Sequence, residues 1–306
     1  AVSEVADADG KPTGAVLSFA IDEATGKLAP KNHRSSGGGG PCHVSVDRTG
    51  RALLAANYGG GSVICLGIAA DGSLEPATSG TPGGFIQHTG KGANPHRQEG
   101  PHAHSIFPAA DGRFAVACDL GLDKVLVHAL DVEKATLAPH GFAAVAPGAG
   151  PRHFAFHPSG RYGYSVNELD LTVTGLEIDA AAGVLHAARP ASTLPADVHD
   201  RAGFSCAEIA VHPGGGFLYA STRGHDSIAM FRIAAGSTDL EFLGAEPSRA
   251  KMPRHFAIAP GGRFLLVGGQ ASNTVAVFAI DGSSGRLSFT GTTVEVPSPV
   301  CIAFRQ

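Results

Sequence analysis

The chain has 306 residues, with 42 glycines, 20 prolines, 43% hydrophobic residues and a formal net charge of −4 at pH 7. This glycine and proline content is high for a helical enzyme and below that of a disordered chain. The near-neutral charge argues against nucleic acid as a partner, and no apolar run approaches the roughly 18 residues of a membrane span. We therefore expect a small-molecule ligand, with neither nucleic acid nor membrane as a partner.

Residues 1–40 predict an incomplete unit of a β-repeat. Ala1-Val2-Ser3-Glu4 matches Ser165-Val166-Asn167-Glu168, and Gly26-Lys27-Leu28 matches Gly285-Arg286-Leu287. The chain is then expected to begin inside a second strand, with roughly 55–60 residues of the whole protein before it, as seven units of about 52 residues require. A signal peptide in that upstream part is an open alternative.

Five further units start near residues 41, 101, 151, 206 and 253, each anchored on a turn glycine. A β-branched residue follows each glycine at a fixed offset, and a leucine follows near the end of the unit. The glycines are Gly50, Gly112, Gly160, Gly215 and Gly262, the β-branched residues Val63, Val125, Val173, Ile228 and Val275, and the leucines Leu74, Leu137, Leu185, Leu240 and Leu287. Spacings this regular indicate a structural repeat.

Each unit is predicted to contain four short strands. In the third, strands are expected at 154–156, 162–166 and 172–178, with Leu185 opening a fourth, because Pro, Gly and Asp stand where hairpins turn. Residues 299–304 predict a lone first strand that would close a ring. The predicted fold is all-β: a seven-bladed β-propeller of four-stranded antiparallel blades, forming one domain over residues 1–306 with its first blade incomplete.

The five cysteines, Cys42, Cys65, Cys118, Cys206 and Cys301, are odd in number and widely spaced, without a CxxC pair. They predict neither a disulfide framework nor a zinc ribbon. We expect small buried residues in strands and a reducing, cytoplasmic compartment.

Two rows of polar residues are expected to meet at one mouth of the central channel. Because the first two strands of each unit fold back at the turn glycine, the start of the first lies beside the end of the second. The first row is Cys42-His43, His102-Ala103-His104, Arg152-His153, Ala207-Glu208, Arg254-His255 and Val300-Cys301; the second is Tyr58, Leu120, Glu168, Arg223 and Gln270, with Glu4 in the partial blade. Arginine forks on an acidic protein indicate an anionic small ligand.

Structural roles compete with functional ones at several of these positions. His43 and His255 could cap a backbone carbonyl between blades, and Arg152 with Glu168 could be a structural ion pair. His157 and His212, in His-Pro turns on the opposite face, are interpreted as structural. His102 and His104 resemble a two-ligand metal hairpin, but no third ligand is evident, so neither a metal nor another cofactor is predicted.

The chain resembles the seven-bladed propeller lactonases, a bacterial family that includes 6-phosphogluconolactonase and has fungal carboxy-cis,cis-muconate cyclases as relatives. The similar segments are Ala56–Val63, Arg97–Ser105, Asp119–Asp123, Pro147–Pro158, Val166–Leu169 and Arg223–Ser227. The resemblance implies hydrolysis of an anionic sugar lactone such as 6-phosphogluconolactone. It places catalytic residues at His104, Arg152, Glu168 and Arg223.

We expect the substrate to be bound by His43, Arg97, His102, His153, Arg254 and His255. Lactone opening needs a base for the attacking water and a cation for the oxyanion. Glu168 or His104 would be the base, Arg152 would stabilise the oxyanion and depress the pKa of Glu168, and Arg223, with Arg254 or Arg97, would bind the phosphate or carboxylate. Alternatives are a muconate cycloisomerase and a non-catalytic binding or scaffold propeller. A monomer or weak dimer is expected.

Overall fold

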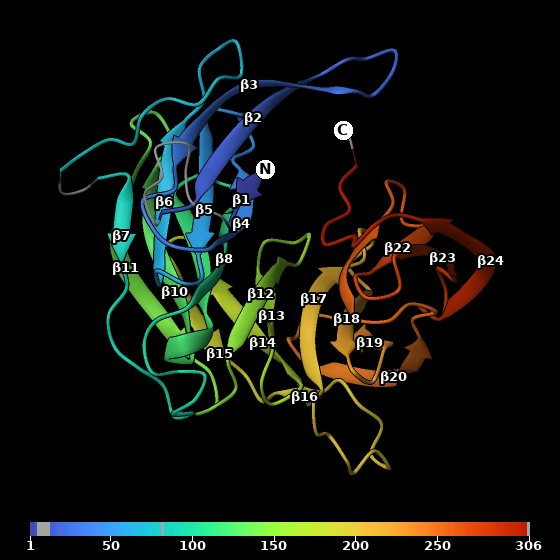
Figure 1. Cartoon of the computed structure of the whole chain (residues 1–306). Coiled ribbons are helices and arrows are strands. Elements are labelled where there is room, and N and C mark those ends of the chain that lie inside the picture. Colours follow the sequence, from blue (N-terminus) through green and yellow to red (C-terminus); the bar gives the residue numbers. More distant parts are fainter. Residues whose placement is uncertain (5–12, 81–82, 305–306) are drawn as a thin grey trace. The chain divides into compact units, whose positions relative to one another are not determined.

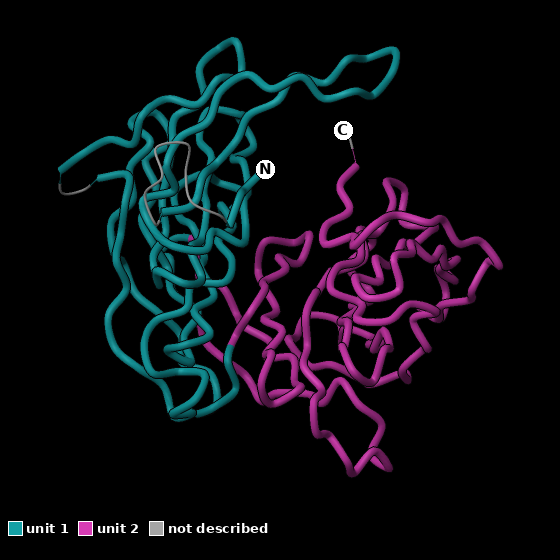
Figure 2. The backbone as a smooth tube through the Cα atoms, in the orientation of Figure 1, with its two compact units in different colours: residues 1–150, 181–184 teal, residues 151–180, 185–306 magenta. Residues whose placement is uncertain are grey.

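The computed structural model describes residues 1–4, 13–80 and 83–304. Two compact units divide the chain (Figure 2): unit 1 comprises residues 1–150 and 181–184, and unit 2 comprises residues 151–180 and 185–306. Each unit is built from consecutive antiparallel sheets (Figure 1), numbered here 1 to 6 in chain order.

Unit 1 contains sheets 1 to 3. Their strands are β1 (Val2–Ser3), β2 (Ala15–Ile21) and β3 (Leu28–Ser35); β4 (Pro41–Val46), β5 (Ala52–Asn57), β6 (Ser62–Gly67) and β7 (Phe85–Gln87); and β8 (Ala103–Pro108), β9 (Phe114–Asp119), β10 (Lys124–Asp131) and β11 (Thr136–Ala144). A short 3₁₀ helix, η1 (Leu120–Leu122), follows β9.

Unit 2 contains sheets 4 to 6. Their strands are β12 (Pro151–Phe156), β13 (Tyr162–Asn167), β14 (Thr172–Asp179), β15 (Val184–Ala187) and β16 (Ala191–Ser192); β17 (Ser205–Val211), β18 (Phe217–Arg223), β19 (Ser227–Ile233) and β20 (Leu240–Pro247); and β21 (Pro253–Ile258), β22 (Phe264–Gly269), β23 (Thr274–Ile280) and β24 (Leu287–Glu295). Val184, the first residue of β15, is grouped with unit 1.

The five turn glycines close the same hairpin in sheets 2 to 6, as predicted. All five have φ between +69° and +75°, the left-handed region that favours glycine. In each, the glycine N–H donates to the carbonyl oxygen three residues earlier at 2.8–3.0 Å. The β12–β13 hairpin, for example, turns at Gly160, whose N–H bonds to the carbonyl of His157 at 2.9 Å. The hairpins therefore have equivalent geometry, and the starts of their first strands are equivalent positions.

The central strand β5 of sheet 2 is buried on both faces because sheets 1 and 3 pack on either side of it. All six residues of β5 are buried. Leu53 belongs to a core cluster shared with sheet 1, whereas Leu54 belongs to one shared with sheet 3. Successive strand residues point to opposite faces, so alternate residues fill the two cores. Burying a leucine completely, as for Leu54, stabilises the fold by about 1.5–3 kcal/mol.

In sheet 2, Leu74 forms an isolated bridge with Ile68, and the fourth strand is β7, after a long loop. Two expectations about individual elements are wrong. Residues 299–304 form no strand, since a strand requires a hydrogen-bonded partner. Cys301 is exposed rather than buried in a strand. All five cysteines are free thiols, as expected.

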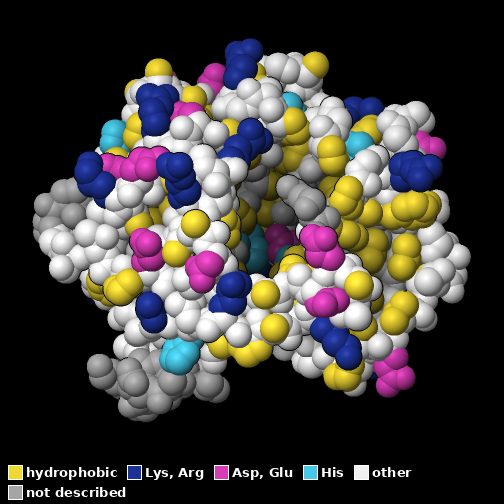
Figure 3. Space-filling view, turned by 90° about the horizontal axis from the view of Figure 1, so that it is seen from above, with side chains coloured by type: hydrophobic (Ala, Val, Ile, Leu, Met, Phe, Trp, Pro, Cys, Tyr) yellow, Lys and Arg dark blue, Asp and Glu magenta, His cyan; other side chains and the backbone are white. Residues whose placement is uncertain are grey.

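The described residues include no helix long and apolar enough to cross a membrane. Lys and Arg side chains intermingle with Asp and Glu on the face shown in Figure 3, and no area of a single sign dominates it. This mixture agrees with the small net charge of the sequence.

Candidate functional site

A β-bulge interrupts the start of the first strand in each of sheets 2 to 6. The pairing register shifts between Pro41 and His43, Ala103 and Ser105, Pro151 and His153, Cys206 and Ile209, and Pro253 and His255. A bulge inserts an extra residue and re-aims side chains. The same pairings place the start of each first strand opposite the end of the second, as in Pro151 opposite Asn167. The two polar rows therefore meet within each of sheets 2 to 6, and their convergence at one mouth of a channel stays a prediction.

In unit 2, one carboxylate holds two arginines. The Nε of Arg152 donates to Oε2 of Glu168 at 3.0 Å, and Nη2 of Arg223 lies 3.0 Å from the same oxygen. Both arginines also bond to carbonyl oxygens of β17: Arg152 Nη1 to Ala207 at 2.6 Å and Arg223 Nη2 to Cys206 at 3.0 Å. Arg152, Glu168 and Arg223 thus lie together, and each is at most 7% exposed.

The arginine cluster carries more positive than negative charge. Burial is the largest influence on the pKa of Arg223 and lowers it to about 10, with Glu168 opposing this and Arg152 and Arg254 adding to it. Arg254 is partly exposed at the start of β21. The Nε of Arg223 is buried without a hydrogen-bond partner among the described residues. Purely structural arginines normally have their donors satisfied, so this arrangement suits an anion-binding site.

A second buried carboxylate in unit 2 lies between two histidines. His153 Nδ1 lies 3.1 Å from both Oε1 and Oε2 of Glu208, and His255 Nε2 lies 3.2 Å from Oε2. Burial raises the pKa of Glu208, but the two histidines and the Ile209 N–H outweigh it and lower that pKa to about 2. Burial lowers the pKa of His153, whereas Glu208 raises the pKa of His255 against the effect of burial.

In unit 1, His102 and Arg97 gather around Tyr58. The rings of Tyr58 and His102 stack with centroids 4.6 Å apart, and Arg97 Nη2 donates to the Tyr58 hydroxyl at 3.3 Å. His102 Nδ1 lies 3.0 Å from the Tyr58 carbonyl oxygen, and its Nε2 lies 3.2 Å from Glu99 Oε1. His102 and the 94–102 loop therefore form one polar group with the end of β5.

His104 is buried in β8 beside a thiol. Its Nδ1 lies 3.7 Å from Cys42 Sγ, and its ring meets the Tyr58 ring edge-on at 5.3 Å. His102 and His104 thus share Tyr58 as a neighbour but differ in their other contacts, Glu99 for His102 and Cys42 for His104. Among the described residues, no three His, Cys, Asp or Glu side chains are arranged to hold a metal ion.

Three histidines join neighbouring sheets, and a fourth contacts the C-terminal segment. His43 Nδ1 accepts the Ile106 N–H at 3.4 Å, and His255 Nδ1 accepts the Ile302 N–H at 3.2 Å. These two contacts are with a backbone N–H, whereas the sequence suggested a backbone carbonyl as one alternative. His157 and His212 reach the carbonyl oxygens of Gly215 and Gly262 at 3.0 and 2.9 Å, as expected for structural residues.

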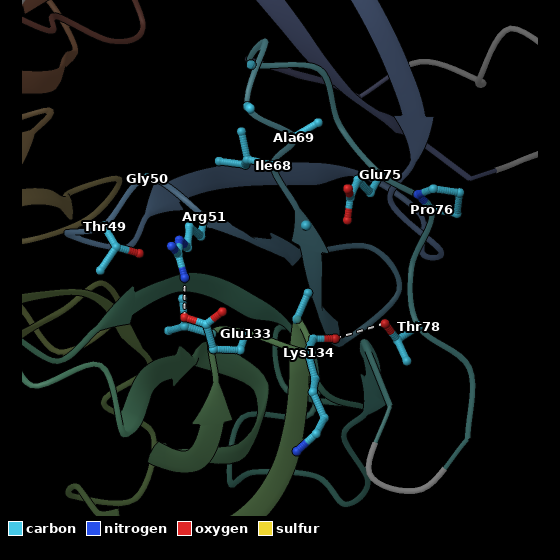
Figure 4. Close-up of a pocket in the computed structure, with 15 residues that line it drawn as sticks. Thr49, Gly50, Arg51, Ile68, Ala69, Glu75, Pro76, Thr78, Glu133 and Lys134 are labelled. Atoms are coloured by element: carbon cyan, nitrogen blue, oxygen red, sulfur yellow. Dashed lines mark hydrogen bonds and ion pairs between the residues drawn. The ribbon is translucent and has the colours of Figure 1, made fainter.

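Two cavities lie beside turn glycines, at the strand ends opposite these polar clusters. The larger, about 710 Å³, lies in unit 1 beside Gly50 (Figure 4), where Arg51 forms an ion pair with Glu133 and Thr78 Oγ1 bonds to the Lys134 carbonyl oxygen at 3.0 Å. The smaller, about 260 Å³, lies in unit 2 beside Gly215. Neither cavity is lined by a buried carboxylate–arginine or carboxylate–histidine cluster like those of unit 2. The Arg51–Glu133 pair is exposed, and exposed ion pairs contribute little to stability.

Comparison with known proteins identifies the family. The model of the family described as "Lactonase, 7-bladed beta-propeller" matches residues 2–304. The chain belongs to this family of seven-bladed β-propeller lactonases. The predicted fold class is thereby confirmed, and sheets 1 to 6 are consecutive blades.

Relatives of this lactonase have related names. It is 38% identical to the 6-phosphogluconolactonase of Bacillus subtilis strain 168, over 97% of this chain and 82% of that protein. It is 33% identical to a 6-phosphogluconolactonase of Formosa agariphila, over 80% of this chain and 68% of that protein. A solved structure, the periplasmic gluconolactonase of Pseudomonas aeruginosa, has a TM-score of 0.85 and 32% identity, with 97% of this chain and 82% of that chain covered.

The predicted site residues of this lactonase fall into two groups. Unit 2 brings together Arg152, Glu168 and Arg223 and places His153 and His255 on Glu208. Unit 1 contains His43, Arg97, His102 and His104. Glu208 was not predicted as a site residue. A signal existed: it is the acid in the otherwise mostly apolar strand Ser205–Val211, at the position where other blades have His43, His153 and His255.

Proposed function

We propose that this lactonase hydrolyses a phosphorylated sugar lactone, with 6-phosphogluconolactone as substrate and 6-phosphogluconate as product. The observation that carries the proposal is the pair of buried guanidinium groups held on Glu168. Planar guanidinium forks match phosphate and carboxylate oxygens. The names of two relatives, the 6-phosphogluconolactonases of Bacillus subtilis and Formosa agariphila, support the same substrate.

Arg152 and Arg223 would stabilise the negative charge that develops on the lactone carbonyl oxygen. Fixed cations in a site shielded from water stabilise a developing oxyanion strongly. Their hydrogen bonds to Glu168 and to the β17 carbonyls hold both side chains before substrate arrives. Arg254, which is partly exposed and close enough to lower the pKa of Arg223, would bind the phosphate.

Glu168 is better suited to anchoring the arginines than to accepting a proton. Its Oε2 already faces two guanidinium groups, each 3.0 Å away. An oxygen engaged by two cations is a poor proton acceptor, because the neighbouring positive charges favour its ionised form. Of the two predicted bases, this consideration argues against Glu168.

Proton release on 6-phosphogluconolactone tests the proposal, with a carboxylated muconate followed by ultraviolet absorbance as the rival substrate. Glu168→Gln and His104→Gln should both lower kcat, and wild-type rates in both would overturn their assignment. Turnover of the muconate but not of the lactone would replace the proposal with cycloisomerisation.

Arg254→Gln should raise KM for 6-phosphogluconolactone by roughly 10–100-fold, as expected for losing a hydrogen bond between charged groups, while KM for unphosphorylated gluconolactone stays constant. Arg286→Gln, at an exposed arginine of unit 2, is the matched control. An equal effect of Arg254→Gln on both lactones would show that Arg254 does not bind the phosphate.

A further inference from the structure

The 94–102 loop of unit 1 is organised around one buried amide. All of its residues lie in the described part of the chain and form neither helix nor strand, yet Gln98 is only 1% exposed. Gln98 Oε1 accepts the Asn94 N–H at 2.7 Å. Its Nε2 donates to the Leu120 carbonyl oxygen at 2.8 Å and to Asp123 Oδ1 at 2.6 Å. Both amide protons and the amide oxygen are therefore engaged, as burial of an amide requires.

Asp123 connects this amide to a second loop of the same unit. It follows η1 directly and is 7% exposed. Besides Gln98, its carboxylate accepts the Gly150 N–H on Oδ1 at 2.9 Å and the Gly148 N–H on Oδ2 at 2.7 Å. Breaking a buried contact of this kind leaves polar groups without partners, which is costly. Gln98 therefore holds the 94–102 loop on a fixed part of unit 1.

The end of the loop is fixed on η1 by its backbone. The His102 N–H donates to Asp119 Oδ1 at 2.8 Å, and the His102 carbonyl oxygen accepts the Leu120 N–H at 3.0 Å. Gly121 allows the two backbones to approach closely. A Cβ at Gly121 would lie 1.9 Å from the Gly100 carbonyl oxygen and 2.8 Å from the His102 nitrogen. Residues 98–102 thus pack directly against η1.

The loop contributes two cationic or polar side chains to the end of β5. The His102 ring stacks on Tyr58 with centroids 4.6 Å apart, and Arg97 Nη2 donates to the Tyr58 hydroxyl at 3.3 Å. A loop without regular structure has to be ordered before its side chains can bind a ligand, and this ordering costs conformational entropy. Contacts that order the loop in advance reduce that cost on binding.

We propose that Gln98 is a positioning residue for substrate binding. It holds the 94–102 loop on η1, so that Arg97 and His102 keep their places around Tyr58 before the lactone arrives. The proposal rests on the proposed lactonase function, with Arg97 and His102 among its predicted substrate-binding residues. Since both amide protons of Gln98 are bound within the chain, Gln98 acts through the loop.

Kinetics of the 306-residue chain test the proposal with two variants that displace the loop by different routes. Gln98→Glu keeps the shape of the side chain but replaces Nε2 with an oxygen that faces Asp123 Oδ1 and a carbonyl oxygen. Gly121→Ala pushes the Gly100 carbonyl away. Each should raise KM for 6-phosphogluconolactone roughly 10-fold, as expected for losing a hydrogen bond that involves a charged group, with kcat near the wild-type value. Ala77→Glu, at an exposed residue of unit 1, is the charge control.

A double-mutant cycle with His102→Gln separates positioning from a general loss of stability. Gln98→Glu should raise KM in the wild-type background and add little in the His102→Gln background, because both changes remove the same contact. The proposal is overturned if Gln98→Glu and Gly121→Ala both keep the wild-type KM. It is also overturned if the effects of Gln98→Glu and His102→Gln on KM are independent.

Hydrogen exchange followed by mass spectrometry measures the order of the loop in the wild-type protein without relying on activity. The N–H groups of Gln98 and His102 are hydrogen-bonded, so the 94–102 segment should exchange slowly, and both variants should exchange faster there. Rapid exchange of this segment in the wild-type protein would overturn the proposal. A wild-type protein with a protected loop that hydrolyses no lactone would instead refute the proposed function.

Discussion

Glu168 anchors two buried cations, so replacing it should destabilise the protein more than replacing either arginine. Glu168→Gln keeps the size of the side chain but removes the charge that faces Arg152 and Arg223. Arg152→Met removes one cation and leaves Glu168 bonded to the other. The two substitutions therefore differ in how much buried charge they leave without an opposite charge.

The expected losses of unfolding free energy are large because both arginines are buried: Arg152 is 2% exposed and Arg223 is 7% exposed. Removing the partner of a buried charge costs about 3–5 kcal/mol, whereas losing hydrogen bonds that involve a charged group costs about 1.5–3 kcal/mol each. We expect the first value for Glu168→Gln. Arg152→Met should cost less, about 1.5–3 kcal/mol, because removing a buried cation also removes its desolvation penalty, which offsets part of the cost of the two lost hydrogen bonds. The double variant should be more stable than the sum of the two effects by about 0.5–3 kcal/mol, because the residues are in contact.

Urea unfolding followed by circular dichroism measures all three variants, with kcat/KM on 6-phosphogluconolactone recorded in parallel. Glu168→Gln should also lower kcat/KM, since both arginines lose their orientation. The reasoning is refuted if Glu168→Gln is no less stable than Arg152→Met, or if the double variant is additive. Either result would mean that the carboxylate does not hold the arginines in solution.

Two further predictions concern stability. His128 is buried, has no hydrogen-bond partner for either ring nitrogen among the described residues, and has a pKa lowered to about 3, mainly by burial and secondarily by His88. The unfolded chain binds this proton below about pH 6.5 and the folded chain does not, so the free energy of unfolding should fall by about 1.4 kcal/mol per pH unit as pH decreases from about 6.5 to 3. His128→Leu should remove that slope, and unchanged pH dependence in urea titrations would contradict it. Gly160→Ala should cost about 1–2 kcal/mol from its φ of +70° alone, since a Cβ there meets nothing within 4 Å. Gly262→Ala should cost more because its Cβ would lie 2.6 Å from His212 Nε2, and equal thermal shifts for the two variants would refute this comparison.

The sequence alone determined the repeat and the ends at which polar residues gather. The five hairpin turns need a positive φ, and glycine adopts it most readily, so this requirement is local. The strands on either side of each turn are likewise indicated by residues close in the chain. The proximity of Arg152 to Glu168 follows from the same local logic, because the hairpin that turns at Gly160 brings the two ends together. Local geometry of this kind can be read from spacing.

The tertiary structure decided which side chains meet between blades. Glu208 contacts His153 and His255, each from a different sheet, and the spacing within one hairpin contains no information about such contacts. The bulge at the start of each first strand also changes where a side chain points without changing the sequence pattern. Hydrogen-bond partners, and with them the tautomer of each histidine, depend on packing between sheets, so only the folded chain determines them.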